Sequence, residues 1–321
     1  MGRSIHKVSG IVWLRRSIQV LCLLLFFYLF LQTAYHPINR TGGPVALFFE
    51  LDPLVLVATW LVGATIPLTL FLSFGTLGVS VLFGRWFCGW ICPFGTLHQM
   101  MTQLRGGSLP TRLKRAEYSP RQKLKYLILI GLLAGTLTGL NLVGWVDPFS
   151  VLYRSMATAV FPALNSGLHA MFAWLYEKDP GVGSVRVTSV SEPVYDVLRN
   201  YLLIEKAPQY HWGIPIGILF GGILVLNLWR HRFWCRYVCP LGALLGLAGK
   251  NPLLRLKKDD EACNHCRLCV AVCPAGANPD GASDPPDAWK PTECMFCWNC
   301  EAVCPKQAIS FEFAVPSRGN S

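Results

Sequence analysis

The chain has 321 residues, of which 52% are hydrophobic and only 15% are charged, and its mean hydropathy is +0.39. This composition excludes an ordinary soluble protein and predicts a small α-helical protein that crosses a membrane several times. The net charge of +11 is concentrated beside the apolar segments. We interpret it as a signal for orientation in the membrane, and no nucleic-acid partner is expected.

The first apolar run, Ile18–Tyr35, follows a basic N-terminal segment that includes Arg15 and Arg16. The run is about long enough for one span. A cleaved signal peptide is the alternative, but the run is longer than the apolar region of a typical signal peptide, which favours an uncleaved anchor. Both interpretations place residue 36 outside the cell membrane.

The second apolar segment, Leu54–Phe83, is 30 residues long. We expect one span, with a tilt or a break near Pro67, because so long a straight helix exceeds the hydrocarbon core. The next segment, Gly84–Lys125, contains eight basic residues against one acid, Glu117. The positive-inside rule therefore predicts that this loop is cytoplasmic.

A third span is predicted at Tyr126–Val143 and a fourth at Trp212–Trp229, with an outer segment at about 147–211 between them. The apolar part of that segment, Val151–Trp174, is expected to be an interfacial helix. A further crossing there would move the basic stretch after residue 229 to the outside. The prediction is about four spans with both termini in the cytoplasm.

The C-terminal part of the chain carries the pattern CxxCxxCxxxCP twice. This is the ligand pattern of bacterial ferredoxins, in which three cysteines hold one [4Fe–4S] cluster and the fourth ligates the other cluster. We therefore assign the first cluster to Cys263, Cys266, Cys269 and Cys304. The second cluster is assigned to Cys294, Cys297, Cys300 and Cys273. Disulfides or zinc would suit the CxxC spacing but do not explain the repeated Cys-Pro.

The apolar segments and the cysteine motifs predict two domains: a transmembrane domain at residues 1–254 and a cytoplasmic 2[4Fe–4S] ferredoxin domain at residues 255–321. Twelve of the thirteen cysteines fall into motifs, and Cys22 is left over in an apolar run. So many clustered thiolates favour a reducing compartment.

An internal repeat accounts for four of these cysteines. Each copy has an Asp-Pro pair, an apolar segment, an arginine three residues before a cysteine, and then CxxxCP at the cytoplasmic face. A twofold relation between the copies would bring together Cys88, Cys92, Cys235 and Cys239. We expect either a third metal centre, iron–sulfur or a soft ion such as copper(I), or reduced thiols with only a conformational role.

These motifs together resemble the membrane polyferredoxins of the NapH and MauN type, which share a core with parts of NosR and CcoG (RdxA). The shared motifs are Cys88-Gly-Trp-Ile-Cys92-Pro93, Cys235-Arg-Tyr-Val-Cys239-Pro240 and the tandem ferredoxin pattern. The resemblance covers about Leu51 to Phe313. It implies a protein of the bacterial inner membrane that serves quinol oxidation and electron delivery to a redox enzyme complex, or metal-related maturation.

Two functional hypotheses follow. The first is an electron-transfer subunit that links the quinone pool to the cytoplasmic clusters, as a component of a quinol-oxidising complex. The alternative is an assembly factor that reduces a metal or a thiol during maturation of another enzyme. Haem is disfavoured as a carrier, because the candidate histidines lie only at span ends, at His36, His98, His211 and His231.

Overall fold

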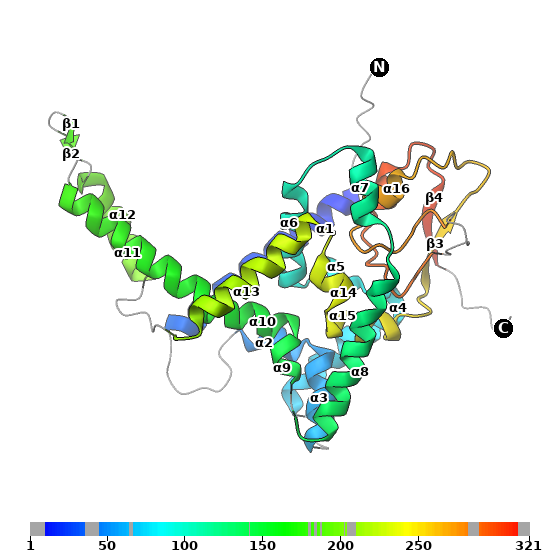
Figure 1. Cartoon of the computed structure of the whole chain (residues 1–321), viewed down its shortest axis with the longest axis horizontal. Helices are drawn as coiled ribbons and strands as arrows, with labels where there is room; N and C mark the ends of the chain where they lie inside the picture. The colour runs from blue at the N-terminus through cyan, green and yellow to red at the C-terminus, as the bar shows by residue number, and fades with distance from the viewer. Residues whose placement is uncertain are drawn as a thin grey trace.

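The computed structural model is mostly helical (Figure 1). It describes residues 10–35, 45–63, 67–140, 142–178, 181–182, 185–186, 188–201, 203, 210–281 and 289–313. Two helical bundles meet at the CxxxCP motifs. A ferredoxin-like part lies at one end of the molecule, and an arm of two helices extends from the other end (Figure 1).

Helix α1 (Gly10–Tyr35) begins earlier than predicted, because its first turns pack on the rest of the protein. The Arg15 guanidinium donates to Asn299 Oδ1 at 3.2 Å, and the Gln19 amide donates to the Gly89 carbonyl at 2.7 Å. Among the described residues, only this helix, over Gly10–Thr33, is long and apolar enough to cross a membrane by length and composition. Its first turns contact the ferredoxin-like part.

The second apolar segment is divided, as Pro67 suggested. After α2 (Ala46–Glu50), α3 (Pro53–Gly63) ends, and the chain resumes at Pro67 in an extended conformation before η1 (Leu68–Leu70) and α4 (Phe71–Phe83). Proline cannot continue a preceding helix, because it lacks the N–H and its ring displaces the residue before it. The two helices pack against each other, so the predicted span is not one continuous helix.

The middle of the chain forms α8 (Leu124–Leu137), α9 (Val143–Val146) and one helical run from Pro148 to Lys178. That run consists of α10 (Pro148–Ser155), a π-turn named η3 (Met156–Val160) and α11 (Phe161–Lys178). It contains the predicted interfacial helix. The arm is completed by β1 (Gly181–Val182), β2 (Val185–Arg186) and α12 (Thr188–Tyr201).

The internal repeat is visible in the packing of the remaining helices. The first copy ends in α5 (Trp86–Trp90) and α6 (Pro93–Leu104), and α7 (Leu109–Ala116) and η2 (Pro120–Lys123) follow. The second has α13 (Gly213–Val225), η4 (Leu226–Leu228), α14 (Phe233–Tyr237) and α15 (Pro240–Ala248). Helix α6 packs on α1 and α13, and α15 packs in the same way on α8 and α4.

The Asp-Pro pairs lie at the junction of the two copies. Asp52 accepts the Leu54 N–H at 2.7 Å, and Asp147 accepts the Ser150 N–H at 2.8 Å, which are N-cap contacts. Both side chains are 0% exposed and face each other. The carboxyls therefore belong to the core, whereas His211 is exposed; His36 lies outside the described residues.

The ferredoxin-like part is tied together by the antiparallel pair β3 (Leu254–Lys258) and β4 (Ile309–Phe313). Their register pairs Leu254 with Phe313. Two short helices lie between these strands in the sequence, each inside one cysteine motif: α16 (Leu268–Ala271) and α17 (Asn299–Val303).

Candidate iron–sulfur sites

The two ferredoxin motifs fold in the same way, although they differ in sequence. His265 and Phe296 occupy the same motif position with φ of 51° and 47°. Arg267 and Trp298 share another position, with φ of 57° and 56°. Such left-handed conformations are uncommon for residues other than glycine and often occur at functional sites. Their repetition indicates that both loops are shaped to wrap around a bound group.

The structure brings together the four thiols assigned to the second cluster. Together with apolar side chains they line one small cavity: Cys273, Cys294, Cys297 and Cys300. Cys273 comes from the other motif, as the ferredoxin pattern predicts. In the first set, Cys269 and Cys304 pack in a common apolar cluster with Ile309. Cys263 and Cys266 are half-buried nearby in the same motif.

Donors around the second set fit an iron–sulfur cluster. The Ala277 N–H points to Cys273 Sγ at 3.4 Å. The buried indole N–H of Trp289 has no N or O partner and lies against the Cys294 thiol. Hydrogen bonds to sulfur tune cluster potentials. A [4Fe–4S] cluster bound by these cysteines would supply single-electron transfer.

Burial affects the protonation of the thiols in both sets. It raises the pKa of Cys269 to about 12 and also raises the pKa of Cys273 and Cys300. Thiolates, not thiols, bind iron, so loading a cluster must release protons from these side chains.

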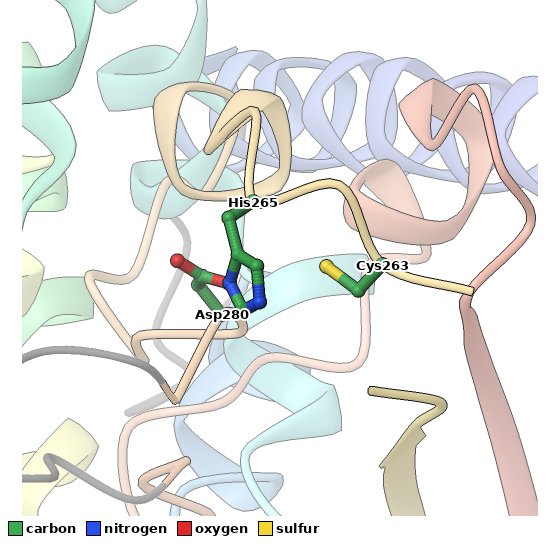
Figure 2. Close-up of side chains that lie close together, drawn as sticks. All are labelled: Cys263, His265 and Asp280. Carbon is green, nitrogen blue, oxygen red and sulfur yellow. The ribbon is translucent and has the colours of Figure 1, made fainter. Parts of the chain in front are cut away.

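Figure 2 shows a charged group beside the first set that sequence analysis did not find. The ligand atoms of Cys263, His265 and Asp280 all lie within 4.8 Å of one another. Asp280 is already engaged, because its Oδ1 lies 3.2 Å from Lys258 Nζ and 3.8 Å from His265 Nδ1. We therefore interpret Asp280 as part of the electrostatic surroundings of Cys263 and not as the ligand of a separate metal ion.

The structure also brings together the four CxxxCP cysteines. All four side chains are buried. Each copy of the repeat also forms a hydrogen bond with the backbone of the other copy. The Arg85 guanidinium donates to the Cys235 carbonyl at 3.1 Å, and that of Arg232 donates to the Cys88 carbonyl at 3.0 Å. These two arginines are the ones that stand three residues before a cysteine in each copy.

The spacing of these sulfurs differs from that of a single-ion site. Among the described residues, no three of the CxxxCP sulfurs all lie within 4.8 Å of one another. A single tetrahedral ion with metal–sulfur bonds of ~2.3 Å would hold its thiolates ~3.8 Å apart. The described structure therefore does not hold these sulfurs in the geometry of a single tetrahedral ion.

The charges around the CxxxCP thiols favour a bound anion. Arg85, Arg232 and Lys125 are all 0% exposed and lie near Cys235. In the described structure, the buried carboxylate that neutralises this group is Glu293, which pairs with Arg85 at 3.0 Å and with Lys125. An iron–sulfur cluster with four thiolate ligands carries net negative charge, so it would balance the excess of buried cations.

The second ferredoxin motif packs directly on the CxxxCP helices. The Trp90 indole N–H donates to the Phe296 carbonyl at 3.0 Å, and Arg232 Nη1 lies 3.0 Å from Met295 Sδ. A Cβ added at Gly89 would lie only 2.6 Å from the Met295 carbonyl oxygen. The CxxxCP thiols and Cys294 are therefore held in one rigid contact region.

Comparison with known proteins agrees with these sites. A family model described as a 4Fe-4S binding domain matches residues 65–112 and 212–259, and a 4Fe-4S dicluster domain matches residues 255–305. The ferredoxin-type protein NapH of Escherichia coli is 24% identical over 81% of this chain and 73% of its own length. An uncharacterized protein of Methanocaldococcus jannaschii is 25% identical over 82% and 78%. These matches support a NapH-type polyferredoxin.

The chain also matches parts of larger proteins. The regulatory protein NosR of Stutzerimonas stutzeri is 26% identical over 75% of this chain, which corresponds to only 26% of NosR. No solved structure matches the chain. The two matched copies of the 4Fe-4S binding domain each contain one CxxxCP motif. This supports the idea that the motif belongs to iron–sulfur chemistry.

Proposed function

We propose that this protein is a membrane-bound electron carrier that links the quinone pool to a redox enzyme system. Its carriers would be two [4Fe–4S] clusters in the ferredoxin-like part, bound by the cysteines assigned from the sequence, and a third cluster bound by the CxxxCP cysteines. The observation that carries the proposal is the direct packing of the second ferredoxin motif, through Met295 and Phe296, on the CxxxCP helices. This contact would place two clusters within reach of each other.

An apolar cavity of about 350 Å³ offers a site for the quinone. It lies between α1 and the η3–α11 run, and no charged side chain lines it. Phe30 and Phe161 contribute to its wall. A lipid-soluble ring could enter such a cavity from the hydrocarbon region.

A continuous series of ring contacts connects this cavity with the CxxxCP site. Phe30 contacts Tyr153, with ring centroids 5.7 Å apart, and Tyr153 contacts Phe49 at 6.2 Å. Phe149 then contacts Phe49 at 6.2 Å and Phe87 at 6.1 Å. Phe87 directly precedes Cys88. The series supports an electron route from the cavity to the buried thiols.

The paired carboxyls lie beside this route and could hold a proton released by quinol. Asp52 Oδ2 and Asp147 Oδ1 have no hydrogen-bond donor, and both atoms are buried. Two carboxylates at close range cannot both carry charge without a large cost, so one shared proton is expected.

The burial of the CxxxCP thiols bears on the alternative role in maturation. An assembly factor that exchanges thiols with another protein needs an accessible, reactive thiolate. These thiols are 4–7% exposed, and burial raises the pKa of Cys92, Cys235 and Cys239. Both properties oppose thiol exchange with another protein.

Iron analysis tests the number of clusters. The anaerobically purified full chain should contain about twelve irons, four for each of three clusters. Cys88→Ser should lower this content toward about eight irons. Cys22→Ser changes the cysteine outside all motifs and should leave the content unchanged. A content of about eight irons in the unaltered chain would exclude a third iron–sulfur cluster.

Electron exchange with quinone requires a separate test. In vesicles that contain only this protein, added quinol or quinone should change the EPR signals of the clusters. Leu164→Trp, which fills the wall of the apolar cavity, should slow that change without loss of iron. If neither quinol nor quinone alters any cluster signal in the unaltered protein, the direct link to the quinone pool is wrong.

A further inference from the structure

A second cavity, of about 500 Å³, lies where α1, the α6–α7 region and the ferredoxin-like part meet. Its polar lining includes Arg16, Arg105, Arg112, Arg115, His231 and Asn299. The aliphatic part of the wall includes Ala302 and Val303, which lie at the C-terminal end of α17. The cavity is distinct from all the cysteine sites, since no cysteine lines it.

The arginines of this cavity have no negative partner in the described part of the chain. None of the four forms an ion pair there with a carboxylate. Arg105 donates to the Leu228 carbonyl at 3.0 Å, which is a neutral acceptor. The positive charge of the cavity is therefore not neutralised by these contacts.

The lack of a negative partner matters most for Arg115, because it is only 5% exposed. Its terminal nitrogens donate to the carbonyls of Arg105 at 2.9 Å and Asn227 at 3.3 Å, and its buried Nε has no partner. Burial, followed by repulsion from Arg105 and Arg112, lowers the pKa of Arg115. Clustered like charges in a partly desolvated site oppose folding unless an anion compensates for them.

The shape and chemistry of the cavity define the anion further. Its volume is within the range of cavities that hold small organic ligands and exceeds what a lone phosphate would fill. Guanidinium groups match phosphate oxygens in a bidentate geometry. Aliphatic side chains on the other wall can cover an uncharged organic part. We infer that this cavity binds a phosphate-bearing organic molecule, with Arg105 and Arg112 on the phosphate.

The cavity is close to the ligands of both ferredoxin clusters. Val272 and Pro274 line it and flank Cys273, and Val303 lines it and precedes Cys304. A molecule bound here would therefore contact the backbone that holds the two cysteines predicted to cross between clusters. Two sources of the same phosphate chemistry fit the site: a soluble nucleotide or the headgroup of an anionic phospholipid.

The test uses the full, cluster-loaded chain in a neutral detergent. Binding of ADP is measured by calorimetry, and binding of short-chain phosphatidylglycerol is measured by native mass spectrometry. Arg105→Gln and Arg112→Gln change exposed side chains and should each weaken the binding of the phosphate-bearing probe at least tenfold. Lys114→Gln is the matched control, because it removes an exposed charge from the same helix α7 outside the cavity.

The outcomes separate the two sources and can overturn the inference. Arginine-dependent binding of ADP would identify a nucleotide site, and arginine-dependent binding of phosphatidylglycerol alone would identify a lipid headgroup site. The EPR spectra of both variants should keep the cluster signals of the unaltered protein, which shows that they fold. The inference is wrong if neither probe binds, or if Lys114→Gln weakens binding as much as Arg112→Gln does.

Discussion

Asp280 is the buried acid closest to the first set of ferredoxin cysteines, with its carboxylate beside Cys263. Negative charge near a cluster stabilises the oxidised form. We therefore expect Asp280→Asn to raise the reduction potential of the cluster proposed at Cys263, on the order of tens of millivolts. A redox titration followed by EPR measures this shift.

Asp260→Asn is the control for this substitution. Asp260 also pairs with Lys258, at 3.1 Å, but its side chain is 81% exposed, so water screens its charge. Its substitution should leave the potential nearly unchanged. Equal potentials for Asp280→Asn and the unaltered protein would show that Asp280 does not act on the cluster.

For single residues, the cysteine spacing predicts which thiols lie together better than it predicts the side chains around them. The ferredoxin cysteines follow a fixed local pattern, and the structure gathers Cys273 with the second motif as that pattern requires. Asp280 and Glu293 lie outside the cysteine spacing and act through contacts with distant segments. One signal was present in the sequence: an arginine three residues before Cys88 and before Cys235.

Glu293 joins the ferredoxin-like part to α8 and to Arg85, which precedes the first CxxxCP motif. Its carboxylate accepts from Arg85 and Lys125 and, at 3.2 Å, from the Tyr126 hydroxyl. Glu293→Gln would leave the buried Arg85 guanidinium without a counter-charge, while burial already lowers the pKa of Lys125 to about 7. We expect it to destabilise the protein by ~3–5 kcal/mol. Thermal unfolding of the detergent-solubilised protein measures the loss.

Glu312→Gln provides the comparison, because Glu312 pairs with Lys257 on the surface, where the side chains are 53% and 67% exposed. Exposed pairs contribute at most about 1 kcal/mol, so this variant should unfold near the temperature of the unaltered protein. A similar small effect for Glu293→Gln would mean that the buried charges are compensated in another way.

Among the helices, the sequence-based predictions agree with the structure where a single residue determines the local conformation. Pro67 breaks the second apolar segment because proline ends helices. The helix predicted at Val151–Trp174 forms, but its π-turn at Met156–Val160 has no simple sequence pattern. The part of α1 before Ile18 is held by a contact of Arg15 with Asn299, which a hydropathy profile does not contain.

At the scale of the whole molecule, the repeat predicts how the two halves meet. The reciprocal contacts of Arg85 and Arg232, and the facing pair of Asp52 and Asp147, relate the halves in the manner of a twofold axis. The described structure does not show the four predicted full-length spans. Length and apolarity mark one such helix among the described residues, and the remaining apolar helices are shorter. Orientation in the membrane therefore needs a direct experiment.

The arm of α11 and α12 and the strands β3 and β4 lie at opposite ends of the molecule (Figure 1). The start of α1 lies at the ferredoxin end, where Arg15 contacts Asn299, and so does the end of η4, where Leu228 contacts Arg105. Helices α1 and α13 thus run in opposite directions between the two ends. Together with the basic loop at Gly84–Lys125, this predicts that the arm is outside and the ferredoxin-like part is inside.

Two reporters can test this orientation in cells. Green fluorescent protein fused after Ser321 should fluoresce, because it folds in the cytoplasm. Alkaline phosphatase inserted at the exposed Glu192 of α12 should be active, because it needs the oxidising outer compartment. Insertion of the phosphatase at the exposed Arg121 is the control and should give an inactive enzyme. An active phosphatase at Arg121 with an inactive one at Glu192 would invert the topology and place the basic loop outside.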